Sequence, residues 1–599
     1  MDIKRWITIL PAIAISCWPG ARLLRSAENL QPPAPDWDTF SDTWAGTDAL
    51  GRALPGFAEV GAPRSGRFVG IFYFLWLGAH PVGGPFDVTK IKMQNPDSPA
   101  WGPMYAPHHW GESIFCHYQS DDPYVLRKHA QMLADAGVDT LIFDVTNQAT
   151  YKSRYLALLH MFDEVRRSGG KTPQVAFLCP FWQPAKVVLE LWKDLYEPNL
   201  YPDLLFRWEG KPLILADPAL LAEMPDKAKA ERIRKSLTFR KPQPDYFQGP
   251  TQPDMWSWLE VYPQHVFKNA TGEAEEMSVG VAQNAVRGRL GSMNEPGVCG
   301  RSFHDKKPAQ KPQDVLYGYN FAEQFEHALK RDPKFIFITG WNEWIAGRHP
   351  SFNGVSGDMF PDEFDQENSR DIEPMKGGHG DNYYYQMASY IRRFKGVRAL
   401  PKASAPQTIR LNGDFSQWAA VKPEFRDDIG DTLHRDFAGY NNYTHFTNSS
   451  GRNDFVALKA ARDPDSLYFY ARTREAITPY TDSDWMMLLI DADQNHNTGW
   501  EGYDFIINRI KHGAKTGVLE RNMGGWKWSP VCDVQFVVKE NEMHLVVPRT
   551  ALGMAPGKGP LRFDFKWADN VPESGDILDF ITHGDVAPNG RFNYRFEGH

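Results

Sequence analysis

The chain has 599 residues, which is more than one hydrophobic core normally supports, and this length predicts two or three domains. The net charge of −8 and the absence of a long basic run argue against a nucleic-acid partner, which needs a face rich in Lys and Arg. Hydrophobic residues make up 42% of the chain, which argues against wholesale disorder. Aromatic residues make up 13%, and sugar rings stack on aromatic planes, although large barrels and sandwiches also need such residues in their cores.

Residues 1–25 predict an export signal. Lys4 and Arg5 form a short basic start, and the apolar stretch from Trp6 to Trp18 is too short to span a bilayer as a helix. The residues up to Cys17 partly match the signal at which lipoproteins are lipidated. We therefore expect an exported protein in the periplasm, outside the cell or at its surface, with a membrane link only through a lipid on Cys17.

The other cysteines are Cys116, Cys179, Cys299 and Cys532. None of them has the CxxC spacing of a zinc ribbon. An oxidising compartment would allow disulfides among them, but lone buried thiols are equally compatible with the spacing.

Residues 66–400 predict a (β/α)8 TIM-like barrel, preceded by a linker or loosely wrapped extension over residues 26–65. Short apolar runs alternate there with helical segments, which is typical of βα units around a parallel sheet. An open doubly wound sheet is the alternative, disfavoured because no GxGxxG turn follows the first run. Seven strands are expected, with an eighth not located: Phe68–Trp76, Thr140–Thr146, Val175–Phe181, Pro212–Asp217, Met255–Leu259, Val279–Gln283 and Phe335–Trp341.

Residues 407–599 predict an all-β antiparallel sandwich. A Pro- and Ala-rich linker at Lys402–Pro406 precedes it. Short alternating runs such as Ser466–Thr473 follow, separated by turns rich in Gly, Asn and Asp. The fold class is therefore α/β with an appended all-β domain.

The strongest catalytic candidate is Glu343. In a barrel, the C-terminal ends of the strands meet at one mouth, and the run ending at Trp341 delivers Asn342, Glu343 and Trp344 there. A carboxylate between aromatic walls is partly desolvated, which raises its pKa toward the range of a general acid. We expect Asn342 to bind a sugar hydroxyl and Trp341 and Trp344 to stack on sugar rings, although a helix-capping Glu between two core tryptophans is the alternative.

A second carboxyl group is required for glycoside hydrolysis. Asp144, at the end of an apolar strand, and Glu260, after a Trp-rich strand, are the two candidates. Adjacent His108 and His109 are expected to bind a sugar hydroxyl or a site carboxylate rather than a metal, because no third ligand accompanies them at helical spacing. The remaining residues expected to line the substrate site are Trp76, Trp110, Trp182 and Glu373.

Several blocks of residues 66–400 resemble the endo-acting α-mannosidases of glycoside hydrolase family 99. They are GIFYFLW at 70–76, HHWG at 108–111, LADAGVDTLIFDVTN at 133–147, WNEW at 341–344 and DIEP at 371–374 before three tyrosines. The resemblance implies that Glu343 engages the sugar 2-hydroxyl. The family's acid/base Glu lies three residues later, where this chain has Ala346, so the second carboxyl must come from elsewhere or the chemistry differs. An insertion after Trp344 is dense in acids: Asp358, Asp362, Glu363, Asp365, Glu367 and Asp371.

The region after residue 407 resembles carbohydrate-binding modules of family 9 in three blocks: NGDFSQW at 412–418, DADQNHNTGW at 491–500 and GYDF at 502–505. Alternating oxygens of Asp491, Asp493 and Asn495, with Asp504 nearby, are typical of the start of a calcium loop. Gly502 at the twelfth position excludes an EF-hand, and a polar hairpin turn is the alternative.

These observations predict an exported glycoside hydrolase that acts on a polysaccharide or glycan through carboxylates, without a catalytic cofactor and with a possible structural calcium in the β domain. Two other functions remain open. The first is a non-catalytic glycan-binding protein that has lost its second acid, and the second is a role in polysaccharide assembly. The absence of a nucleotide-phosphate motif disfavours assembly.

Overall fold

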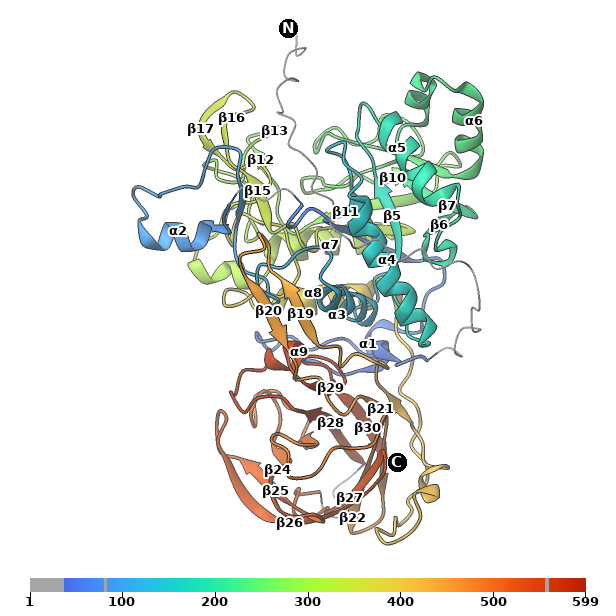
Figure 1. Ribbon diagram of the computed structural model, residues 1–599, viewed down its shortest axis with the longest axis vertical. Helices are drawn as coiled ribbons and strands as arrows, with labels where there is room; N and C mark the ends of the chain where they lie inside the picture. Colours follow the sequence, from blue (N-terminus) through green and yellow to red (C-terminus); the bar gives the residue numbers. More distant parts are fainter. Residues whose placement is uncertain (1–36, 80–82, 555–559, 599) are drawn as a thin grey trace.

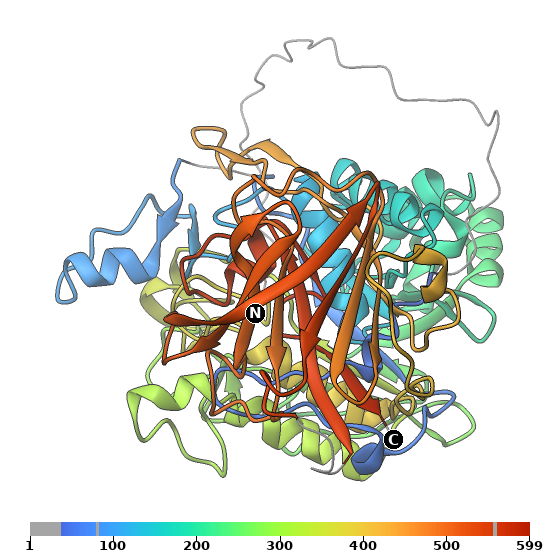
Figure 2. The ribbon, with the colours of Figure 1, turned by 90° about the horizontal axis from the view of Figure 1, so that it is seen from below.

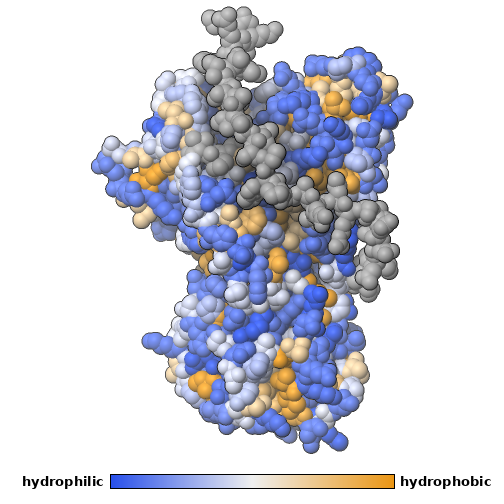
Figure 3. All heavy atoms as spheres, viewed as in Figure 1, coloured by the Kyte–Doolittle hydropathy of each residue, from blue (hydrophilic) through white to orange (hydrophobic). Residues whose placement is uncertain are grey.

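The structure is a computed structural model that describes residues 37–79, 83–554 and 560–598. Figure 1 shows an α/β part, blue to yellow, above an antiparallel β domain, orange to red. The predicted export signal, including Cys17, lies outside the described residues. Within the described ranges no helix has the length and apolar character needed to cross a membrane, and the face shown in Figure 3 is mostly hydrophilic with small hydrophobic patches.

Eight parallel strands form a nearly closed barrel. They follow one another in the order β14 (Phe335–Thr339), β1 (Phe68–Tyr73), β4 (Thr140–Asp144), β5 (Gln174–Leu178), β7 (Lys211–Leu215), β8 (Thr238–Pro242) and β9 (Met255–Trp256), with β11 (Ala274–Gly280) on the other side of β14. β9 and β11 form no ladder. The antiparallel strand β10 (Phe267–Lys268) lies at this gap, where the Asp254 amide donates to the Lys268 carbonyl at 3.1 Å.

Six of the seven predicted strands are therefore confirmed in place. The seventh, Val279–Gln283, was placed too late in the chain, since it shares only its first two residues with β11 (Ala274–Gly280), and the eighth is β8. Its sequence, TFRKP, carries no apolar run, because Arg240 in its centre is buried at 3% exposure and pairs with a carboxylate. The helices around the barrel are α3 (Pro123–Asp135), α4 (Lys152–Arg167), α5 (Ala185–Leu191), α6 (Lys227–Ser236), α7 (Tyr319–Arg331) and α8 (Asn382–Lys395).

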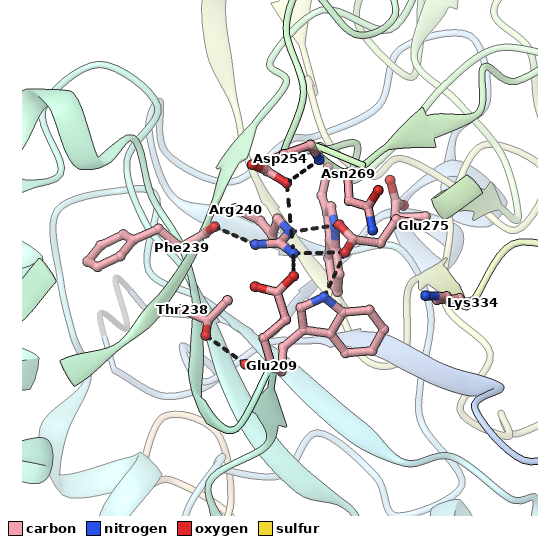
Figure 4. A network of polar contacts seen from close by, with 12 residues as sticks. Glu209, Thr238, Phe239, Arg240, Asp254, Asn269, Glu275 and Lys334 are labelled. Atoms are coloured by element: carbon pink, nitrogen blue, oxygen red, sulfur yellow. Dashed lines mark hydrogen bonds and ion pairs between the residues drawn. The ribbon is translucent and has the colours of Figure 1, made fainter. Parts of the chain in front are cut away.

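A buried ion pair closes the N-terminal end of the barrel, between β8 and β11 (Figure 4). Arg240 donates from Nε and Nη2 to the two carboxylate oxygens of Glu275 at 2.7 and 2.8 Å. The indole N–H groups of Trp208 and Trp256 donate to the same carboxylate at 2.9 and 2.8 Å. Arg240 also reaches Glu209 at 2.9 Å, on the exposed side of the network.

The β domain is one continuous antiparallel sheet. Its strands follow one another as β18 (Phe425–Arg426), β21 (Phe455–Arg462), β22 (Ser466–Thr473), β27 (Glu542–Pro548), β26 (Trp528–Lys539), β25 (Thr516–Asn522), β24 (Phe505–Gly513), β23 (Met487–Asp491), β28 (Leu561–Asp569) and β29 (Asp585–Ala587), with β30 (Tyr594–Gly598) also on β28. The predicted antiparallel β domain is confirmed. In place of two separate sheets, one sheet curls so that rings such as Phe469 and Phe565, 5.6 Å apart, pack across its interior.

The two parts pack together at α3 and α8, where Tyr124 donates to the Thr582 carbonyl and Tyr385 accepts from the Arg591 amide; seen from below in Figure 2, the β strands lie across the α/β part. A hairpin of β19 (Arg435–Ala438) and β20 (His445–Asn448) reaches the barrel, where Arg435 donates to the buried carboxylate of Asp122 at 2.8 Å. Residues 37–65, the described part of the segment expected as a linker or loose wrap, are a packed wrap: Trp44 is buried and contacts Phe592 at 5.4 Å between ring centroids. All four cysteines in the described ranges are free thiols.

The Arg240–Glu275 pair yields a stability prediction. Because Glu275→Gln removes the buried charged partner of the guanidinium and leaves only the exposed Glu209, we expect it to destabilise the protein by about 3 kcal/mol. Glu209→Gln is the matched control, since Glu209 pairs with the same arginine but has a 58% exposed side chain, and it should cost at most about 1 kcal/mol. Thermal and denaturant unfolding of both variants measure the difference, and equal losses would contradict the assignment.

Candidate functional site

A cavity of about 190 Å³ opens at the C-terminal mouth of the barrel. Pockets that bind drug-sized ligands span roughly 300–1,000 Å³. This cavity is smaller, so its volume suits a single sugar ring rather than a long segment of a glycan. Aromatic rings from β1 and the loops form much of its wall. The lining residues are Phe72, Phe74, Trp76, Asp144, Thr146, Asn147, Leu178, Phe181, Trp258, Glu343, Asp362 and Arg370.

Asp144 reaches this cavity from the last position of β4. Its Oδ1 accepts a hydrogen bond from the Thr146 amide at 2.9 Å, which fixes the carboxyl at the strand end. Burial raises the pKa of Asp144 to about 6, and the charge of Asp362 adds to this rise. The Thr146 amide and the charge of Arg370 oppose it. The carboxyl group is thus protonated over a useful part of the mildly acidic range.

Glu343 reaches the cavity just beyond β14 and is paired there with Arg370. The guanidinium Nη2 donates to Oε2 of Glu343 at 2.7 Å, and both side chains are almost fully buried. Burial raises the pKa of Glu343 well above its usual value, while Arg370 opposes this rise. Arg370 also lies 3.4 Å from Glu363 and 3.9 Å from Asp362, so one guanidinium serves three carboxyl groups.

The segment Arg370–Glu373 holds the Glu343 loop in place. The Gly340 amide donates to the Arg370 carbonyl at 3.1 Å, and the Glu373 amide donates to the Trp341 carbonyl at 3.0 Å. The Glu343 amide donates to the Asp371 carboxylate. The catalytic candidate is therefore fixed through its main chain as well as its side chain.

Glu373, expected to line the substrate site, instead lies fully buried behind it. Its carboxylate accepts hydrogen bonds from Ser113, Tyr118, His129 and the indole of Trp344. With four donors around it, this side chain holds neighbouring elements together and does not face the cavity.

Asn342 and the two tryptophans predicted to stack on sugar rings, Trp341 and Trp344, are buried and make contacts within the protein. Asn342 accepts from the Phe74 amide at 2.9 Å and donates to the Phe74 carbonyl at 3.2 Å, which ties the Glu343 loop to the end of β1. Trp341, Trp344 and Trp110 are at most 2% exposed. Trp344 stacks on Trp110 at 4.6 Å between ring centroids and packs in the core beneath the site.

The two histidines lie in the short strand β3 (Pro107–His109), which pairs with β15 (Ile345–Gly347). His108 bonds the Ala106 carbonyl through Nδ1 and accepts from the Gly102 amide through Nε2, an arrangement that requires the neutral ring. Burial lowers the pKa of both histidines. Neither residue lines the 190 Å³ cavity.

Of three further residues expected in the substrate site, one lines the cavity and two lie elsewhere. Trp76 lines the cavity. Glu260 does not: it is buried and its carboxylate accepts from the amide of His265 and bonds that residue's ring, with burial raising its pKa to about 7. Trp182 is 72% exposed and lies outside the cavity lining.

The cavity contains residues that the sequence patterns did not single out. Arg370, Trp258 and Phe181 line it, and Asp362 does so from the acid-rich insertion, with a 42% exposed side chain. In the sequence, the many acidic residues of that insertion are the signal that could have indicated a buried arginine such as Arg370, because buried carboxylates need a cation nearby. The indole N–H groups of the cavity residues Trp76 and Trp258 are buried and have no hydrogen-bond partner in the described residues.

In the β domain, Asp491, Asp493 and Asp504 each offer a carboxylate oxygen, and these oxygens lie within 4.8 Å of one another. Much of their capacity is used inside the turn: Asp491 accepts from the Gln494 amide at 2.6 Å and Asp504 from the Ala492 amide at 2.9 Å. Asn495 accepts from the Asn497 amide at 3.1 Å. These bonds alone build a polar hairpin turn, and calcium here stays a prediction.

A larger cavity of about 610 Å³ lies between the wrap, α8 and the β domain. Two of its arginines are paired with acids, Arg591 with Asp381 at 2.7 Å and Arg595 with Asp564 at 2.8 Å, and Arg392 donates to the Trp44 carbonyl at 2.9 Å. We place the candidate active site at the smaller cavity, because Asp144 and Glu343, which follow from the C-terminal ends of two barrel strands, both line it.

No protein-family model matches the sequence, and no curated protein is similar to it. Among solved structures, two of a GH99 endo-α-mannosidase from Bacteroides thetaiotaomicron are similar, one of them in complex with BIS-TRIS-propane. They are 16% and 17% identical to this chain, cover 55% of it and 97% and 98% of their own lengths, and have TM-scores of 0.33 and 0.34. Likeness at these TM-scores carries no argument about the chemistry of this chain.

The raised pKa of Asp144 predicts a pH-dependent stability effect. Between pH 3.8 and about 6 the unfolded chain loses this proton while the folded chain keeps it. The carboxyl group therefore lowers the free energy of unfolding progressively as the pH rises through this range, and the full reduction is present above pH 6. Asp144→Asn keeps the acceptor for Thr146 and should raise stability by up to about 3 kcal/mol at neutral pH. The melting temperatures of variant and wild type at about pH 4 and about pH 8 test this. An equal difference at both values would contradict the assigned pKa.

Proposed function

We propose that the barrel is a glycoside hydrolase that cleaves a polysaccharide or glycan through Asp144 and Glu343. The observation that carries the proposal is that these two carboxyl groups, from the ends of the two strands flanking β1, line one aromatic cavity at the C-terminal mouth. Such a mouth is where barrel enzymes have their active sites. Two carboxyl groups flanking the scissile bond are the requirement of most glycoside hydrolases.

The two carboxyl groups have different neighbours, which separates their roles. Asp144 has a pKa near 6 and no ion-pair partner in the described chain within 4.0 Å, so we assign it the general acid that protonates the leaving oxygen. Burial raises the pKa of Glu343 as well, but its contact with the Arg370 guanidinium at 2.7 Å favours the charged form, and we assign it on this contact the carboxylate that acts as base or nucleophile. Asp362, on the same cavity and partly exposed, is the third carboxyl group within reach of a bound sugar.

Sugar recognition would use the aromatic wall and the two free indole donors. Trp76 and Trp258 present ring faces for stacking and N–H groups without partners in the described structure. A buried unpaired donor is costly until a ligand satisfies it, which favours a ligand with hydroxyl groups over an apolar one.

A non-catalytic glycan-binding barrel is the second candidate function. The ion pair between Glu343 and Arg370 favours it, because a carboxylate bonded to a buried guanidinium has one oxygen fewer for chemistry. The residues that would bind the sugar are the same in both cases, so only a turnover measurement separates the two functions.

A hydrolysis screen over polysaccharides and glycans tests the proposal. We expect product release by wild type, reduced at least about a hundredfold in Glu343→Gln and in Asp144→Asn, since each removes acid–base catalysis. Glu273→Gln is the matched control, because Glu273 is an exposed acid at the opposite end of the barrel, and it should keep full activity. Glycan binding by wild type without any product would favour the binding protein.

Trp258→Phe tests the role of the indole donor separately. The ring face remains while the N–H group is lost, so KM for a short soluble substrate should rise about fivefold, as expected for one hydrogen bond of ~1 kcal/mol, with a smaller change in kcat. Trp528→Phe is the control: its indole N–H is also unpaired, but it lies in β26 of the β domain. An equal rise in KM for both variants would contradict a contact between Trp258 and the sugar.

Export through residues 1–25, the sugar-binding role of the β domain and calcium at the Asp491 turn stay predictions. They are compatible with a secreted hydrolase that carries an accessory module. None of the assigned roles in the cavity depends on them.

A further inference from the structure

Three aspartates meet in the interior where the β domain packs on the barrel. Asp427 follows β18, Asp431 lies four residues later in the same loop, and Asp585 begins β29. Their side chains are at most 4% exposed, and each offers a carboxylate oxygen within 4.8 Å of the other two. This set, Asp427, Asp431 and Asp585, is called here the junction cluster. It is separate from the 190 Å³ cavity and from the Asp491 turn, which have other lining residues.

Four oxygens of the junction cluster are buried without any hydrogen-bond partner: both of Asp427, Oδ1 of Asp431 and Oδ1 of Asp585. The remaining oxygens are satisfied, since Gln131 donates to Asp431 at 3.0 Å and the Phe455 amide donates to Asp585. An unpaired buried carboxylate oxygen is among the most costly groups in a protein interior. Four of them together indicate that something absent from the protein chain satisfies them.

Protein cations do not fill this role. No Lys, Arg or His nitrogen of the described chain lies within 4.0 Å of the three carboxylates. Lys128 on α3 faces the cluster at longer range, and Lys566 donates instead to the Pro588 carbonyl. Two more aspartates, Asp428 and Asp454, add negative charge close by.

We propose that the junction cluster binds one divalent cation, with Ca²⁺ as the expected ion. Calcium takes six to eight oxygen ligands at about 2.3–2.6 Å, so oxygens on opposite sides of the ion lie up to about 5 Å apart, which matches the spread of the cluster. Asp427 offers both of its oxygens, and Asp431 and Asp585 offer one each. Water or main-chain carbonyl oxygens complete the ligand set.

The location gives the ion a structural role at the domain junction. Gln131 on α3 holds Asp431, and Arg127 on the same helix donates to the Ile429 carbonyl in the cluster's loop at 2.6 Å. Figure 1 shows β29 directly below α3 and α8. A bound cation fixes this loop and β29 to each other, and so fixes the surface on which α3 packs.

Metal content and thermal unfolding of the full chain test the proposal. Wild type freed of metal with chelator should rebind Ca²⁺ from calcium chloride, and its melting temperature should rise by about 3 °C or more at saturating Ca²⁺. Asp427→Asn should bind one Ca²⁺ fewer per chain than wild type and should lose this rise. Asp436→Asn, which changes an exposed acid of β19 outside both acidic clusters, is the control and should keep both.

The stability order in chelator distinguishes a metal site from a purely structural cluster. Without metal, Asp427→Asn removes an unpaired buried charge, so it should unfold at the same temperature as wild type or higher; in Ca²⁺ the order should reverse. Asp585→Asn retains an acceptor for the Phe455 amide and gives the same test if Asp427→Asn does not fold. The proposal is wrong if wild type retains no Ca²⁺ or Mg²⁺ and melts identically with and without them. It is equally wrong if both variants keep the wild-type metal content.

Discussion

The candidate site depends on a segment of four residues, Arg370–Glu373, that runs beside the loop after β14. Its side chains alternate in direction and reach different partners: Arg370 holds Glu343, Asp371 accepts from the Glu343 amide and from Trp110, and Glu373 accepts from four buried donors. A barrel mouth filled with aromatic rings has little water, so every carboxyl group in it needs a donor from the protein. This segment supplies or receives most of those bonds, and the position of Glu343 follows from it.

This arrangement places more acidic than basic groups in the interior, which costs stability and produces the chemical difference between the two carboxyl groups. Burial raises the pKa of both groups, but their contacts differ: Asp144 has only an amide to stabilise its charge, whereas Glu343 has a guanidinium in contact. The difference in contacts is what distinguishes the two carboxyl groups on one cavity. The buried pair Arg240–Glu275 at the opposite end of the barrel shows the contrasting case, in which charge, donors and geometry are matched and the pair serves the fold.

The sequence was sufficient for the barrel and for part of the site. Strands buried on both faces are continuous apolar runs, so six were predictable in place, and their ends indicated Asp144 and Glu343. β8 was not, because a buried ion pair replaced the apolar residue at its centre with Arg240. Arg370 contacts Glu343 across a separation of 27 residues that includes β15, and no periodicity predicts such a contact. Trp344 was expected to face a sugar, and this expectation was wrong. The strand ends at Thr339, and beyond it the alternation of side chains no longer indicates which of them face the mouth.

The position of Ala346 explains why the second acid lies elsewhere. Ala346 is 1% exposed and stands in β15, where it pairs with His108 of β3, so a carboxylate there would be buried against a neutral ring and not on the cavity. The insertion after Trp344 carries Asp362, which lines the cavity, together with Arg370, which compensates its charge. Asp362 and its counter-charge Arg370 thus reach the cavity on the same segment of the chain. Position 346 therefore adds no carboxyl group to the cavity, which Asp144 and Asp362 line beside Glu343.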